Sequence, residues 1–454
     1  MRTTFFFSSQ LWRKNRFSLI IIFVLTFLTL DLVINQVSDV LKPQNTSSAG
    51  ITLFIIIVVI YSLGQYKILN YIDAINKSVR EKSHVISLVH KVVKAQQFFM
   101  VAILALVVME ILSISQYHTV LIEISESASF GLTFILLFIF STKFFQWYRS
   151  SRNSRAVLIF GMAFAAAGIL MAGVLFVELA RLGEKEQIRT ANSDVFFPDT
   201  AEERGYFFQL LALIITYTRL TSFVLLIAAT ALLIYNQIAK IGKLKFWIII
   251  TLPLIYYVGT IIDVMGIYVP ETDNEILIYY TLASVNLVGG GILFAIPFRS
   301  MARKMREDDP TRKYMMTAAY GFIIFFGLNQ TTLFVAPYPP YGLAAQSISA
   351  LATYMIFVGL YSTAVSMSQN MQLRQFIRRI ALGDVNLLSS IGSAQMDIEV
   401  RRVVNDMKDV IQKEETEMAE KTGIETPMAA NEMEEYMKVV LEEASKARKN
   451  KSAS

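Results

Sequence analysis

The sequence predicts an all-α membrane protein, a polytopic bundle of about ten transmembrane helices with a helical cytoplasmic tail. Of its 454 residues, 54% are hydrophobic and only 17% are charged, whereas a soluble domain has roughly a quarter of its residues charged. Uncharged runs of about twenty residues, the length that crosses a bilayer, recur along the chain. Lysines and arginines gather in alternate segments between these runs, as the positive-inside rule requires.

The apolar runs give the positions of the spans. The first run is too long for a signal peptide and has no small-residue cleavage site after it, so we expect a retained span. The six expected inner segments, with the tail counted only as far as Arg379, carry 26 lysines and arginines, and the five outer loops carry five. This asymmetry predicts a multi-pass protein of the cell membrane with both termini in the cytoplasm. The expected spans are 18–37, 50–68, 97–117, 122–145, 156–180, 208–236, 246–268, 276–298, 314–336 and 343–367.

We divide the chain into a three-span unit (1–117), a seven-span bundle (118–368) and a cytoplasmic tail (369–454). In the first unit, apolar residues between Ile72 and Val93 recur every three or four positions. This spacing predicts a cytoplasmic helical extension over 69–95 whose apolar face packs on the tail. A helix lying on the membrane surface is the alternative.

The tail has its own apolar stripes, and Asn431 with Glu434 is typical of the start of a last helix. The stripes are too narrow to form an independent core. We therefore expect 369–449 to bind another protein surface, either the extension or a cytoplasmic partner.

Two features of the loops and spans have simple interpretations. The loop 181–205 is long enough to cap the outer face, and Asn45 begins an N-x-[ST] triplet that fits glycosylation on that side. Small residues favour close helix packing. They occur together at Gly289-Gly290-Gly291 and along one face of the fifth span at Gly161, Ala165, Gly168 and Ala172.

The residue inventory excludes several functions. The chain has no cysteine and three histidines, so we expect no metal site and no thiol chemistry. No phosphate-binding loop, dinucleotide fingerprint or zinc-protease motif is present, and we expect no cofactor and no enzymatic activity. The net charge of +6 comes from basic residues that flank spans, so it indicates a lipid bilayer and not a nucleic acid as the partner.

The stretch from Gly359 to Thr422 contains LYSTAVSMSQ, LRQFIRRIA, LLSSIGSAQM and EMAEKTGIE. In these segments the chain resembles a group of uncharacterised archaeal multi-span membrane proteins. The resemblance covers the last two spans and the tail, and it implies no activity.

Polar residues inside the spans are the candidate functional residues, because charges are costly there and face protein or water. Arg219, Asp263 and Glu110 lie within spans, and we expect Asp31 and Glu178 to reach water at the outer edge. We predict that Arg219 pairs with Asp263, or else with Glu110, as a structural ion pair or in an aqueous pocket. Uncharged polar residues of the same outer half are Asn286, Asn329, Gln330 and Gln346.

These features favour a membrane sensor or signalling scaffold, with an outward-facing polar pocket and a helical cytoplasmic output. The alternative is a secondary transporter of a small polar or anionic solute, because ten spans fit two inverted five-span halves. The extension between the second and third spans has no counterpart after the seventh, which argues against such a repeat.

Overall fold

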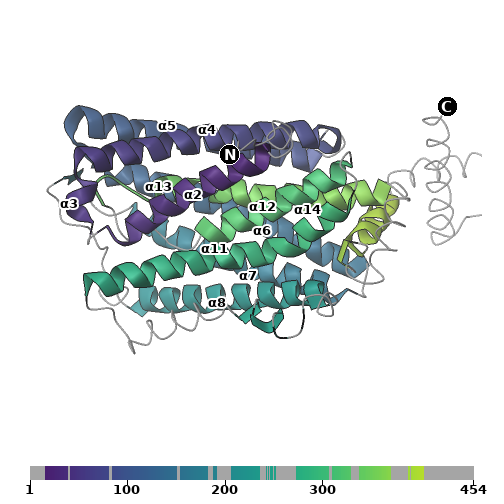
Figure 1. The fold of residues 1–454 in the computed structure, drawn as a ribbon. Coiled ribbons are helices and arrows are strands. Elements are labelled where there is room, and N and C mark those ends of the chain that lie inside the picture. The colour runs from purple at the N-terminus through teal and green to yellow at the C-terminus, as the bar shows by residue number, and fades with distance from the viewer. Residues whose placement is uncertain are drawn as a thin grey trace, which may run out of the picture.

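The computed structural model is helical over nearly all the residues that it describes (Figure 1). These are 16–38, 41–80, 84–150, 154–182, 188–191, 206–235, 242, 244, 246–248, 250–251, 272–305, 309–328, 337–369, 387–388 and 390–402. The helices are α2 (Arg16–Gln36), α3 (Lys42–Asn45), α4 (Ser48–Arg80), α5 (His84–Ile114), α6 (Thr119–Ser150), α7 (Arg155–Arg181), α8 (Tyr206–Ile234), α11 (Asp273–Lys304), α12 (Pro310–Leu328), α13 (Leu343–Ser347) and α14 (Ser349–Gln369).

The all-α class and the membrane assignment are confirmed. Seven segments of the described residues are long and apolar enough to cross a bilayer. They are α2, α4, α5, α6, α7, α8 and the segment Leu343–Ser368, which contains α13 and α14. Helix α11 covers the expected eighth span and α12 begins the ninth, while most of the expected span 246–268 lies outside the described residues.

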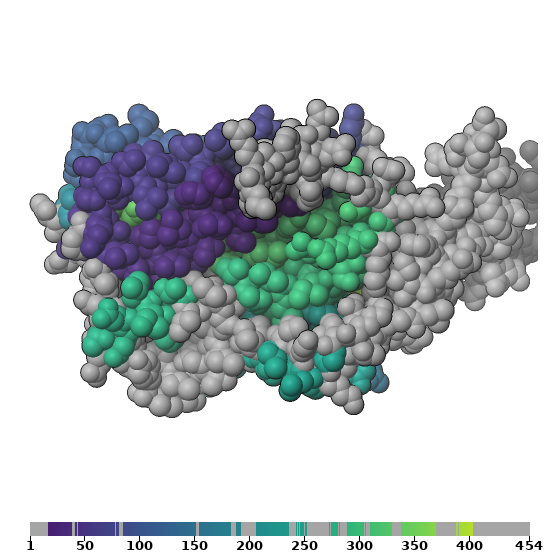
Figure 2. Space-filling model, in the orientation of Figure 1, coloured from purple at the N-terminus to yellow at the C-terminus, as the bar shows by residue number. Residues whose placement is uncertain are grey.

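The helices from α6 onward pack largely in chain order. Helix α6 packs on α7 and α7 on α8, while α11 packs on α12 and α12 on α14. Helix α14 also contacts α6, and α8 contacts α11. The N-terminal helices α2 and α4 contact α12 and α13 from outside this group, and Figure 2 shows their purple surface beside the green surface of later helices. Every residue of the segment Leu343–Ser368 except the half-buried Ser366 is buried as a result.

Glycines set the closest helix approaches. A Cβ built on Gly359 of α14 would lie 2.6 Å from the backbone N of Ala318 on α12, and one built on Gly321 of α12 would lie 2.8 Å from the N of Ile356. Gly291 of α11 approaches the backbone of α12 in the same way. The predicted seam of α7 is confirmed at Gly161 and Gly168, which face side chains of α6.

Helices α4 and α5 form the predicted extension. Ile72, Ile86 and Val93 are fully buried in it. Its partners are bundle helices: the Tyr314 hydroxyl of α12 donates to the Ile75 carbonyl (3.0 Å), and Ser362 of α14 donates to the Asn76 side chain (2.8 Å). The stripe therefore has partners within the bundle, and its packing on the tail stays a prediction, because most of the tail lies outside the described residues.

The described residues of the tail after α14, 387–388 and 390–402, are helical and lie at the end of the bundle beyond α14 (yellow-green in Figure 1). Leu387, Ile391 and Ala394 are buried, and Gly392 lies against Met367 of α14. The expected last helix at 431 lies outside the described residues.

One small sheet was not predicted. Strand β1 (Gln116–His118) pairs antiparallel with β2 (Ile188–Thr190), and Tyr117 lies opposite Arg189. Helix α5 consequently ends at Ile114, before the expected end of its span. Strand β2 pairs residues 188–190 of the loop 181–205 with the α5–α6 connection, while 183–187 and 192–205 lie outside the described residues. Asn45 is only 5% exposed, so we do not propose glycosylation there.

Candidate binding site in the outer half of the bundle

The last of the seven apolar segments is interrupted near its N-terminal end. Helix α13 ends at Ser347 and α14 begins at Ser349. A buried loop, 337–342, precedes α13, and Gly342 begins it at φ +90, a conformation that favours glycine. An interrupted helix at membrane depth must find other partners for the backbone groups that it frees.

Side chains from three neighbouring helices donate hydrogen bonds to the backbone carbonyls that the interruption leaves without a helical partner. Ser129 of α6 donates to the Gln346 carbonyl (2.9 Å), as does Ser349 (2.9 Å), and the two hydroxyls are 2.8 Å apart. Gln97 of α5 donates to the Ser347 carbonyl at 3.0 Å, and the Tyr61 hydroxyl of α4 lies 3.4 Å from the same oxygen.

Asp31 of α2 binds the other end of α13. Its carboxylate accepts from the backbone N of Ala345 at 3.1 Å, and Gly342 and Ala344 also donate to it. Asp31 is fully buried, so our expectation that it reaches water was wrong. Backbone N–H groups at the start of α13 thus bind a fully buried carboxyl group.

Our expectation that Glu178 reaches water was also wrong. It is also fully buried, and Arg181, one turn later on α7, donates to both of its oxygens at 3.1 and 3.2 Å. The two residues form a local ion pair at the outer end of α7.

The side chain of Gln346 takes part in none of these hydrogen bonds. Its side chain is 1% exposed, and neither its amide oxygen nor its amide nitrogen has a hydrogen-bond partner among the described residues. One carboxyl oxygen of Asp31 also has no hydrogen-bond partner among the described residues. Buried polar groups are normally paired, so an unpaired amide points to a polar occupant such as water or a ligand. We call Asp31, Gln97, Ser129, Gln346 and Ser347 the α13 cluster.

The structure gives Glu110 a partner other than Arg219. Glu110 accepts from the backbone N of His118 at 3.0 Å, and its other oxygen lies 2.9 Å from Nδ1 of the same histidine. Glu110 therefore holds the turn from α5 into β1. Arg219 is half-buried on α8, and no carboxylate of the described residues forms an ion pair with it. Asp263 lies outside the described residues, so its pairing with Arg219 stays a prediction.

Of the uncharged polar residues predicted from the sequence, one lies in the cluster and the side chains of the other three are not described. Gln346 lies in the α13 cluster. Asn286 is on α11, but its side chain is not described, and Asn329 and Gln330 lie outside the described residues.

The small sheet covers the loop that leads into α13. The Tyr117 hydroxyl donates to the Pro337 carbonyl at 2.7 Å, and its ring stacks on Tyr338 at 6.2 Å between centroids. Burial raises the pKa of the Tyr117 phenol above its ordinary value, and burial lowers the pKa of the Arg189 guanidinium opposite it. Tyr117 therefore links the small sheet to the loop that leads into α13.

Sequence reasoning missed the serines of the site. Ser125 and Ser129 stand four residues apart on α6, hence on one face, and both lie against α13. The same spacing rule applied to small polar residues, and not only to charges, would have indicated this face.

No known protein family, curated protein or solved structure matches this chain.

Proposed function

We propose that the protein is a membrane sensor or signalling scaffold of the cell membrane, with the α13 cluster as its receptive site and the cytoplasmic tail as its output. In this proposal α11, α12 and the segment 246–268 complete ten spans, and both termini are cytoplasmic. The three helices α2, α4 and α5 act as a unit that supports the cluster from one side.

The observation that carries the proposal is the continuity of α6 and α14 from the cluster to the tail. Ser129 lies near the outer end of α6, and Trp147 near its inner end donates to Gln395 of the tail at 2.9 Å. Ser349 begins α14, and Ser368 near its end donates to Glu399 of the tail at 3.3 Å. A change in packing at α13 thus reaches the tail through two helices that contact both.

A matched pair of serine variants tests this coupling. Ser129→Ala removes a hydroxyl that bonds the Gln346 carbonyl, and Ser222→Ala removes one that bonds the Ala163 carbonyl between α8 and α7 at 3.2 Å. Each change costs about 1–3 kcal/mol at most. We expect Ser129→Ala to raise hydrogen exchange of the backbone amides in 387–402 several-fold in lipid nanodiscs, and Ser222→Ala to leave it unchanged. Equal effects of the two variants would show that the tail responds only to global stability.

The interrupted helix favours a second candidate, because transporters bind substrates and ions at broken helices within the membrane. Access distinguishes the two functions, since a transporter opens its site to both sides in turn and a sensor opens it to one. The chain has no cysteine, so single cysteines can be introduced without removing any.

The access experiment uses Gln346→Cys in sealed proteoliposomes of known orientation and a membrane-impermeant maleimide. Two reporter variants mark the two sides of the membrane. These are Ser113→Cys near the C-terminal end of α5 and Ser150→Cys at the C-terminal end of α6. The sensor proposal predicts that the thiol introduced by Gln346→Cys reacts from the Ser113 side alone. Reaction from both sides would favour transport, and the same side for both reporters would overturn the topology.

A further inference from the structure

Lys67 of α4 lies at the same level as Lys91 and Lys94 of α5. Two contacts set the register of these antiparallel helices. The Tyr61 hydroxyl donates to the Gln97 side chain at 3.1 Å, and Asp73 Oδ1 lies 3.4 Å from His90 Nε2. Lys67 lies midway between Tyr61 and Asp73, and both other lysines lie between His90 and Gln97.

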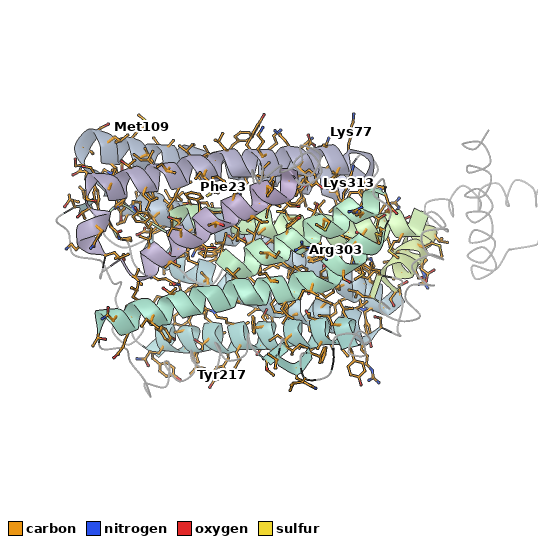
Figure 3. The ribbon with its side chains drawn as sticks, viewed as in Figure 1. Phe23, Lys77, Met109, Tyr217, Arg303 and Lys313 are labelled. Carbon is orange, nitrogen blue, oxygen red and sulfur yellow. The ribbon has the colours of Figure 1, made fainter. Side chains whose placement is uncertain are left out.

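Helix lengths place this level at one edge of the hydrocarbon layer. Twenty residues of helix span about 30 Å, the thickness of that layer. Counted from the outer end of α4 at Ser48 they end beside Lys67, and counted from the outer end of α5 at Ile114 they end at Lys94. Two independent helices thus give the same boundary. Figure 3 shows the two ends of this hairpin, with Met109 at one and Lys77 at the other.

The surroundings of the three lysines fit a lipid headgroup. All three are exposed, and none forms an ion pair with a carboxylate of the described residues. Asp73, further along α4, is paired with Arg80.

Apolar side chains are exposed beside the lysines. Leu63 is 60% exposed and Tyr66 is 47% exposed on α4, and Phe98 is 49% exposed on α5. Apolar side chains facing the acyl chains, an aromatic ring at the boundary and a group of unpaired ammonium groups are the features that bind an anionic lipid at a membrane surface.

We propose that Lys67, Lys91 and Lys94 form a binding site for the phosphate of an anionic phospholipid in the leaflet at the tail end of the bundle. The acyl chains of this lipid lie along the exposed apolar faces of α4 and α5. The site is separate from the α13 cluster and does not depend on the sensor proposal.

Thermal unfolding in detergent with added lipid tests the site. Phosphatidylglycerol should raise the unfolding temperature of the full chain more than phosphatidylcholine does, and inorganic phosphate should leave it unchanged. Changing all three lysines to glutamine should weaken phosphatidylglycerol binding on the order of 100-fold, since each lysine near an anionic surface contributes about fivefold.

Lys77→Gln is the matched control. Lys77 is also exposed on α4, but ten residues further along, about 15 Å beyond the boundary. It should keep the full phosphatidylglycerol effect, as should the triple Lys→Arg variant. Three results would overturn the site: an equal effect of the two lipids, an undiminished effect in the triple glutamine variant, or an effect of phosphate equal to that of phosphatidylglycerol.

Discussion

Gly359→Ala tests whether the contact between α12 and α14 sets the stability of the bundle. The new Cβ would lie 2.6 Å from the Ala318 backbone N and 2.7 Å from the Tyr314 carbonyl oxygen. Ordinary contact begins at 3.4 Å, so the helices would have to separate by about 0.8 Å in a close-packed interior. Neither obstructing atom belongs to a side chain that can rotate away.

The expected cost follows from two opposing effects. Overpacking a well-packed interior costs about 1–3 kcal/mol, while alanine gains about 1 kcal/mol over glycine within a helix. We therefore expect a net loss of up to about 2 kcal/mol in the free energy of unfolding. The measurement is an SDS titration in mixed micelles followed by far-UV circular dichroism.

Gly289→Ala is the control, because a Cβ there meets nothing within 4 Å. Only the helical gain applies, so this variant should equal or exceed the wild type in stability. A Gly359→Ala protein as stable as the Gly289→Ala protein would refute the packing argument.

Three further outcomes are expected. Trp147→Phe removes the donor to the tail and leaves a buried acceptor unpaired, so limited proteolysis of the tail should become faster, whereas Trp247→Phe at an exposed position should have no effect. Asp31→Asn replaces one of the two carboxyl oxygens that face the backbone N–H groups of α13 with an amide group that cannot accept, and it should lower the free energy of unfolding, measured by the same SDS titration, by about 1–3 kcal/mol. If Arg219 and Asp263 form an intramembrane pair, changing both to leucine should be milder than either single change in that titration.

The positions of the helices could be predicted because hydropathy is a local property. The run from Phe17 to Gln36 needs only its own residues to identify it as a span. The predicted third span ended three residues too late, because the large aromatic side chain of Tyr117 is typical of a membrane span. Its burial comes instead from β2 and the loop at Tyr338, which are distant in the sequence.

The candidate site could be predicted only in part. Gln346 stood out as a polar residue within a span, and it lies in the cluster. The role of Asp31 could not be predicted, because a carboxylate near the end of a helix usually reaches water. Here the segment from Gly342 to Ala345, more than 300 residues later, donates to its carboxylate. No local pattern in α2 encodes that contact.

The burial of the segment Leu343–Ser368 has a consequence for biogenesis. It is the least apolar of the seven spans, and all of its residues except Ser366 are buried. It is also made after the helices that surround it, so α4, α5 and α6 enter the bilayer before their central partner exists. Until it arrives, Gln97 and Ser129 have no partner in α13, and the incomplete bundle holds polar groups at membrane depth. Insertion of this helix is therefore the step that converts a set of separate hairpins into one closed assembly.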